Sequence, residues 1–253
     1  MKKLILSIIM LATLGCLQAQ DCSCSNWSKY VINFDPSSVI NQQFRKTSSI
    51  GDYTSYDFSD IIANNSQHYI GYFGEDKQRF RFVVLEVKRS FGNKMTYNVR
   101  GISNVNKSPR EFWGTLTIKG IKGFNDIYNE IDSSSVGEIK DRGLLIGDFE
   151  FKEKKRESAT GVFSGVYAAR WYIDSDDNMR YDDIAKDSEY YWNNQYCGKW
   201  KSYKSNETTK CAWGHADIPC MGDLNVGEGE FVPNPKYNWG NMEFDWEKSV
   251  VEK

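Results

Sequence analysis

Residues 142–174 constrain the fold of this chain most strongly, because they form two long patterned segments joined by a charged turn. The first segment places Phe149 and Phe151 on one face, and the second places Phe163 and Tyr167 on one face. Alternation with a period of two is typical of β-strands. The stretch RGLLIGDFEFKEKKRESATGVFSGVYAARWYID therefore predicts an antiparallel hairpin.

The opposite face of the second segment is also apolar, with Val162, Val166 and Ala168. A strand that is apolar on both faces needs cover on its outside. We expect this cover from a helical segment at 121–137 and from aromatic residues of the tail 221–253.

Between residues 30 and 204 further segments show strand patterns separated by turn-forming residues, and we count about eight to nine strands. They include a first strand at 30–34 and a last strand at 198–204, and a helix is expected to begin near Asp35. The fold is predicted to be all-β and mainly antiparallel, a single meander barrel or a sandwich with one or two short helices.

Three glycines, Gly114, Gly147 and Gly165, fall on apolar strand faces, where they permit the coiling that closes a sheet. They favour the barrel over the sandwich. The meander order is similar to that of lipocalin-like barrels, which is a resemblance of architecture only and implies no site residues.

The N-terminus predicts export from the cytoplasm. Two lysines precede an apolar run from Leu4 to Leu14, and small or polar residues follow through Ala19. This is the pattern of a secretory signal peptide, and the run is too short to span a bilayer comfortably. The expected organisation is a signal peptide, a β domain and an irregular aromatic-rich tail packed on it, at residues 1–19, 20–220 and 221–253.

Cys16 offers an alternative to simple cleavage, because Thr13-Leu14-Gly15-Cys16 partly resembles the lipid-attachment motif of bacterial lipoproteins. Thr13 stands where an aliphatic residue is usual, so cleavage after Ala19 is the favoured interpretation. The protein is then secreted, periplasmic or at the cell surface, and not transmembrane. The signal, the Asn-, Lys- and Tyr-rich usage and the aromatic tail resemble small secreted proteins of Bacteroidetes-type bacteria that have no assigned role.

An oxidising compartment favours disulfides among the remaining cysteines. Cys211 and Cys220 enclose a short loop and are the pair that we expect to be joined first. One of Cys22 or Cys24 then reaches Cys197 and fastens the N-terminal segment to the last strand.

Two metal-binding patterns are weaker than their structural alternatives. A set of Cys197, Cys211, His215 and Cys220 has the ligand count for zinc, but zinc ligands usually come in C-x2-C pairs and exported thiols oxidise. Residues 174–183 resemble the start of a calcium loop, but Met179 stands where that loop needs glycine. An acidic hairpin turn is the favoured interpretation there, and we expect neither a metal nor a cofactor.

Aromatic residues are the feature with most bearing on function, since they make up 15% of the chain. Their flat rings can line a sugar- or lipid-binding surface, although they can equally fill a β core and its cover. The candidates for a ligand surface are Trp113, Trp171, Trp192 and Trp200.

The favoured function is non-enzymatic binding of an extracellular ligand or macromolecule. The formal net charge of −2 gives no reason to expect nucleic acid, and no catalytic residues are assigned. The alternative is a secreted glycosidase-like hydrolase that uses paired carboxylates. A cleft with two carboxylates would favour the hydrolase, an apolar cavity in a barrel would favour ligand binding, and a filled core would argue against both kinds of pocket.

Overall fold

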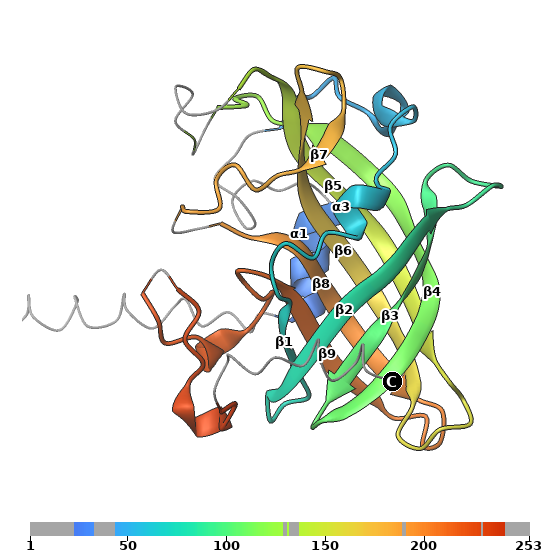
Figure 1. Ribbon diagram of the computed structural model, residues 1–253. Helices are drawn as coiled ribbons and strands as arrows, with labels where there is room; N and C mark the ends of the chain where they lie inside the picture. Colours follow the sequence, from blue (N-terminus) through green and yellow to red (C-terminus); the bar gives the residue numbers. More distant parts are fainter. Residues whose placement is uncertain are drawn as a thin grey trace, which may run out of the picture.

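The structure, a computed structural model, describes residues 23–32, 44–128, 131, 137–188, 191–228 and 230–240. Nine strands form one antiparallel sheet, and hydrogen bonding runs through eight of them and returns to its start (Figure 1). The predicted all-β, mainly antiparallel fold is confirmed. The closed ring of strands decides between the two architectures in favour of the barrel.

The elements of the described chain alternate long strands with short connections. The helices are α1 (Cys24–Ile32) and α3 (Ser59–Ile62), with 3₁₀ helices η1 (Ile50–Tyr53), η2 (Gly222–Leu224) and η3 (Pro235–Tyr237). The strands are β1 (Ile70–Phe73), β2 (Gln78–Arg89), β3 (Thr96–Val105), β4 (Ser108–Gly123), β5 (Ile139–Glu153), β6 (Gly161–Asp174), β7 (Met179–Tyr181), β8 (Asn193–Ser202) and β9 (Thr208–His215).

The ring is a meander in which each strand pairs with the next. Its one departure is β7, which pairs with the far end of β6 while β8 continues the ring. Pairing of β1 with β9 closes the ring, with Gly71 opposite Trp213 and Phe73 opposite Cys211. Consecutive pairing explains why turn signals in the sequence were sufficient to predict the order of strands up to β8.

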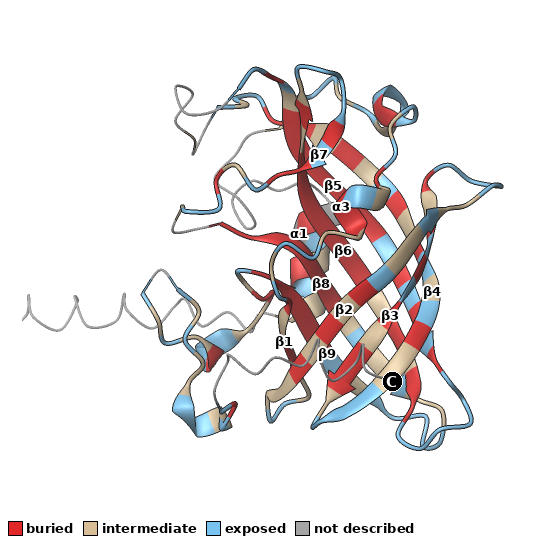
Figure 2. Ribbon diagram, viewed as in Figure 1, coloured by how far each residue is buried: buried red, intermediate tan, exposed pale blue. Residues whose placement is uncertain are grey.

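Aromatic side chains fill the barrel interior. Buried residues alternate with partly or fully exposed ones along much of β2, β3 and β4 (Figure 2), and the buried apolar ones belong to the barrel core. Phe82 stacks on Phe112 at 4.8 Å between ring centroids, and Tyr196 stacks on Trp213 at 4.9 Å. An eight-stranded barrel is just wide enough for side chains to fill it, and this one is occupied by its own core.

Glycine is required where neighbouring strand backbones approach most closely. A Cβ atom on Gly114 would lie 1.8 Å from the Glu150 carbonyl oxygen, and one on Gly165 would lie 2.3 Å from the Cys197 carbonyl oxygen. No side chain fits at such distances, so these two positions allow the strands to coil tightly into a ring.

One side of the outer surface is apolar and covered. Val166 and Ala168, on the outer face of β6, belong to the same buried cluster as Val31 of α1 and Leu224 and Trp239 of the C-terminal segment. Both covering segments lie on the same side of the barrel (Figure 1). The two-faced pattern of this strand is therefore explained by cover from the two ends of the described chain.

The helical cover expected at 121–137 is wrong in its described part. Residues 121–123 are the end of β4, where Ile121, Lys122 and Gly123 pair with residues 143–145 of β5. Ile121 is buried in the barrel core, and Phe124 belongs to the outer cluster. The apolar residues near the end of β4 therefore lie on opposite faces of the sheet rather than on one face of a helix.

Two further expectations are corrected. Residues 30–32 belong to α1, because Trp27 and Val31, one helical turn apart, pack together onto the barrel. The last strand of the ring is β9 and not the segment 198–204, and part of β9 lies in the stretch that was expected to be a loop between Cys211 and Cys220. The helix expected near Asp35 lies outside the described residues.

The disulfide predictions are half right. Cys24 is joined to Cys197, which ties α1 to β8 as expected. Cys211 is a buried free thiol, so the predicted Cys211–Cys220 pair is wrong. Cys211 points into the barrel core, whereas Cys220 packs with the outer cluster, and residues on opposite faces of a sheet cannot be bridged.

Cys220 is itself disulfide-bonded. Because Cys197 and Cys220 are both in disulfides, the zinc set of His215 and three cysteines cannot form. Disulfides are typical of an oxidising compartment outside the cytoplasm. No helix among the described residues is long and apolar enough to cross a membrane.

Replacing Cys24 with serine should lower the melting temperature by roughly 5–15 °C, since a disulfide typically contributes about 2–4 kcal/mol. The bridge spans 173 residues of sequence and holds the cover of the outer apolar face. Differential scanning calorimetry measures the shift. Cys211→Ala is the matched control, with an expected shift of less than about 5 °C. Equal shifts, or a disulfide-linked Cys211 in peptide mapping, would contradict this assignment.

Candidate functional site

The four tryptophans predicted to share a ligand surface lie in different environments. Trp171 is buried in the barrel core, Trp192 is buried in the outer cluster, and Trp200 is half-buried at one end of the barrel. Trp113 lies on β4 with 43% of its surface exposed. The structure does not bring these four residues together, and only Trp113 is available to a large ligand.

Trp113 stands in the middle of an outward-facing row that crosses four strands. Arg100 on β3 and Lys152 on β5 are its direct cross-strand neighbours, and Glu86 on β2 lies opposite Arg100. Strand alternation places Phe112 inward and Trp113 outward, so the sequence pattern of β4 requires this exposure.

A shallow hollow of about 490 Å³ opens around this row. It is lined by Glu86, Lys88, Asn98, Val99, Arg100, Trp113, Gly114, Thr115 and Lys152. We name this surface the Trp113 face. It combines one exposed aromatic ring with hydrogen-bonding donors and acceptors, the composition expected of a binding surface.

Ion pairs organise the charges of the Trp113 face. Arg100 contacts Glu86 at 3.3 Å and Glu111 at 3.1 Å, and Lys154 contacts Glu111 at 3.0 Å. Lys88 also pairs with Glu86. A hydrogen bond from Lys88 is the main reason that the pKa of Glu86 is lowered, and one from Lys154 plays the same part for Glu111.

Lys154 also approaches Trp113, with its Nζ atom 5.9 Å from the ring centroid, at the limit of a cation–π contact. Trp113 was predicted from the sequence, but its charged neighbours were not. The alternation of β2, β3 and β5 gives the outward faces of these strands, but only the pairing register brings Glu86, Arg100 and Lys152 beside the ring.

A second hollow of about 370 Å³ lies where η1 crosses the end of β5. Asp141 Oδ2 accepts hydrogen bonds from Arg45 Nη2 at 2.5 Å and from the Tyr53 hydroxyl at 2.9 Å. Burial, and then the charge of Asp141, raise the pKa of Tyr53 to about 12. Arg45, Tyr53 and Asp141 hydrogen-bond to one another and hold the segment around η1 against β5, so their role is structural.

The second carboxylate of this hollow is also engaged. Asp52 accepts hydrogen bonds from the backbone N–H and the hydroxyl of Ser49, which forms a capping box at the start of η1. Asp52 caps η1 and Asp141 holds η1 against β5. This pair therefore does not offer the free acid and the free base that a glycosidase-like hydrolase would need.

The acidic segment that resembles a calcium loop is the turn between β6 and β7. Asp174 Oδ1 accepts from the backbone N–H groups of Asp176 and Asn178 at 3.0 and 2.8 Å, and Oδ2 accepts from Arg180 Nε at 2.9 Å. The bond from Asn178, followed by that from Arg180, lowers the pKa of Asp174 to about 2. Within the described residues no group of three or more potential metal ligands occurs.

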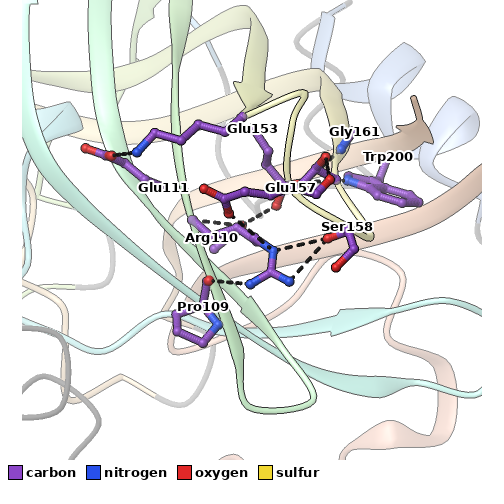
Figure 3. A network of polar contacts seen from close by, with 11 residues as sticks. Pro109, Arg110, Glu111, Glu153, Glu157, Ser158, Gly161 and Trp200 are labelled. Atoms are coloured by element: carbon purple, nitrogen blue, oxygen red, sulfur yellow. Dashed lines mark hydrogen bonds and ion pairs between the residues drawn. The ribbon is translucent and has the colours of Figure 1, made fainter. Parts of the chain in front are cut away.

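Glu153 is a buried carboxylate at the end of the barrel shown in Figure 3. It accepts hydrogen bonds from Ser103 Oγ at 2.6 Å, Gly161 N at 2.9 Å and Trp200 Nε1 at 2.9 Å. Burial raises the pKa of Glu153 despite these three donors. The side chain ties β3, β6 and β8 to β5, so its role is structural.

The sequence contains a signal for the burial of Glu153, because alternation along β5 places it on the same inward face as Phe149 and Phe151.

Arg110 lies at the same barrel end and donates to the Ser158 carbonyl oxygen at 3.2 Å (Figure 3). Arg110 also lies 3.6 Å from the partly exposed carboxylate of Glu157.

Glu153→Ala should lower the free energy of unfolding by about 3 kcal/mol, because three donors lose their acceptor in a buried site. Chemical denaturation measures the loss. Glu157→Ala removes a nearby, partly exposed carboxylate and should cost less than about 1 kcal/mol. Similar losses in the two variants would show that Glu153 does not hold the strands together.

His215 is enclosed in the barrel wall beside two tyrosines. Its Nδ1 atom lies 2.7 Å from the Tyr181 hydroxyl, which receives a hydrogen bond from the Tyr191 hydroxyl at 3.2 Å. The His215 ring also lies 4.0 Å from the ring of Tyr69, measured between centroids. Burial, with a smaller contribution from His68, lowers the pKa of His215 to about 3. The imidazole is therefore neutral and serves packing at ordinary pH.

This burial should make stability depend on pH. Between pH 6.5 and about 3 the unfolded chain binds a proton at His215 that the folded chain cannot, so stability falls as pH falls. The contribution reaches about 1.4 kcal/mol per pH unit. Urea denaturation at several pH values measures the slope. The slope should decrease in His215→Gln and persist in His68→Gln, and an unchanged slope in His215→Gln would contradict the assignment.

Neither a protein-family model, nor a curated protein, nor a solved structure matches this chain.

Proposed function

We propose that this protein is exported and binds a polysaccharide on the Trp113 face without catalysing a reaction. The observation that carries the proposal is the 43% exposure of Trp113 inside a hollow of about 490 Å³. A tryptophan costs free energy when its ring is left in water, so a ring displayed between polar side chains suggests a contact surface.

The distribution of free surface supports the same location. The barrel interior is packed with aromatic rings, and α1 and the C-terminal segment cover the outer face of β6. The carboxylates Asp141, Asp52 and Glu153 are each engaged in hydrogen bonds that hold the fold. The outer faces of β2 to β5 offer open surface with an aromatic ring at its centre.

The chemistry of the Trp113 face suits a sugar chain. The C–H face of a pyranose ring is flat and apolar and can lie on an indole, while its hydroxyl groups need both donors and acceptors. Asn98, Thr115 and the Arg100–Glu86 pair provide both kinds of group around the ring. An open hollow on a sheet can accept the middle of a polymer, whereas a small molecule would remain mostly in water.

The cellular location is consistent with such a partner. The N-terminal residues have the pattern of a secretory signal, and the Cys24–Cys197 disulfide suits an oxidising compartment. We therefore place the interaction outside the cytoplasm, either in a released protein or in one anchored through Cys16.

Affinity electrophoresis in gels containing laminarin, galactomannan, polygalacturonate or chondroitin sulfate tests the proposal. At least one of these polysaccharides should retard the protein, and Trp113→Ala should weaken that binding by about tenfold or more, as loss of an interface tryptophan usually does. Phe91→Ala removes a fully exposed aromatic residue outside the hollow and should bind like the wild type. The proposal is wrong if none of the four retards the protein, or if both variants behave alike.

A further inference from the structure

We infer that the polysaccharide bound by the Trp113 face is anionic, with carboxylate or sulfate groups along its chain. This inference rests on the proposed function and specifies its ligand. It follows from the charge of the hollow, the hydrogen-bonding capacity left on its cations, and their spacing across the sheet.

The hollow is positive although the protein is not. Three cations, Lys88, Arg100 and Lys152, line it together with one carboxylate, Glu86. With the ion-pair partners just outside the lining, Lys154, Glu111 and Glu150, four cations face three carboxylates. The whole chain has a formal net charge of −2. A local excess of positive charge on an acidic protein attracts anions to that place and leaves the rest of the surface repulsive to them.

The cations retain donors for a ligand. Arg100 uses Nε toward Glu86 and Nη1 toward Glu111, and its Nη2 atom makes no hydrogen bond to the described residues. Lys152 pairs with Glu150 at 2.8 Å, and an ammonium group has three donors. The Lys88 side chain is 73% exposed, so its ammonium can reach an incoming anion.

The positions of these cations fit a chain that crosses the strands. Arg100 and Lys152 stand on β3 and β5, with Trp113 between them on β4. Since neighbouring strands are about 4.8 Å apart, the backbones at Arg100 and Lys152 are roughly 10 Å apart across the sheet. A sugar ring on Trp113 can therefore place the acidic groups of its two neighbours near one cation each.

The requirement for both a ring and charges separates this ligand from other polyanions. A polypeptide such as polyglutamate carries carboxylates without a flat C–H face for the indole. Single-stranded DNA has both phosphates and stacking bases, so it is the strongest competitor and belongs in the test.

Binding is measured by biolayer interferometry with polygalacturonate, galactomannan, polyglutamate and oligodeoxythymidylate, at about 50 and about 500 mM NaCl. Polygalacturonate should bind at least about tenfold more tightly than galactomannan at low salt, and high salt should remove that advantage. Polyglutamate and oligodeoxythymidylate should bind more weakly than polygalacturonate.

The variant Lys88→Gln/Lys152→Gln should weaken polygalacturonate binding by about threefold or more and weaken galactomannan binding by less than that. Lys119→Gln is the matched control, because Lys119 is an exposed lysine of the same sheet that does not line the hollow. Circular dichroism melting curves establish that each variant is folded.

The outcomes separate the two proposals. Equal binding of polygalacturonate and galactomannan, still lost in Trp113→Ala, would overturn the anionic ligand and leave polysaccharide binding in place. Binding that Trp113→Ala does not change would overturn both. Oligodeoxythymidylate binding more tightly than polygalacturonate would assign the Trp113 face to nucleic acid, and polyglutamate binding equally well would show that charge alone is recognised.

Discussion

Closure of the strand ring through the short pairing of β1 with β9 is the contact on which the rest of the structure depends. It joins four residues of β1 to β9 and places Trp213 beside Phe80 in the core, with 5.0 Å between their ring centroids. A closed ring leaves no unpaired sheet edge within the barrel and turns the inward faces of eight strands toward one another. Large aromatic rings then fill the enclosed space, because burial of each ring is strongly favourable.

A filled interior determines where function can lie. Residues directed inward, such as Tyr196 and Trp213, are committed to the core. The buried side chains of Glu153 and His215 make hydrogen bonds within the barrel wall. The outer face of β6 is in turn occupied by α1 and the C-terminal segment. Within the described part of the chain, the outer surface of β2 to β5 is open, and Trp113 lies there.

The ion pairs of that surface affect recognition more than stability. Exposed pairs such as Arg100 with Glu111 contribute little to folding because water screens them, yet they fix the orientation of charged groups before a ligand arrives. A guanidinium group held by two carboxylates loses little further freedom when it binds a third acceptor. The Trp113 face can thus be rigid without being buried.

The sequence by itself determined the class of the fold, the approximate number of strands and the tie between the N-terminal segment and Cys197. Period-two alternation and turn residues are local signals, and each strand of this meander pairs with its neighbour in sequence. The hairpin of β5 and β6, its inward phenylalanines and the glycine at 165 followed from such signals.

The tertiary structure alone decided which apolar strand faces point into the barrel core and which are covered from outside by α1 and the C-terminal segment. Cys211 looked available to Cys220, but ring closure by β9 turned its thiol into the core and left Cys220 outside. Four tryptophans looked equivalent. Alternation along β4 directs Trp113 outward, and the tertiary structure left that outer face exposed while it buried Trp171 and Trp192. The neighbours of that ring, Arg100 and Lys152, come from other strands, and a pairing register between strands is not encoded within any one of them.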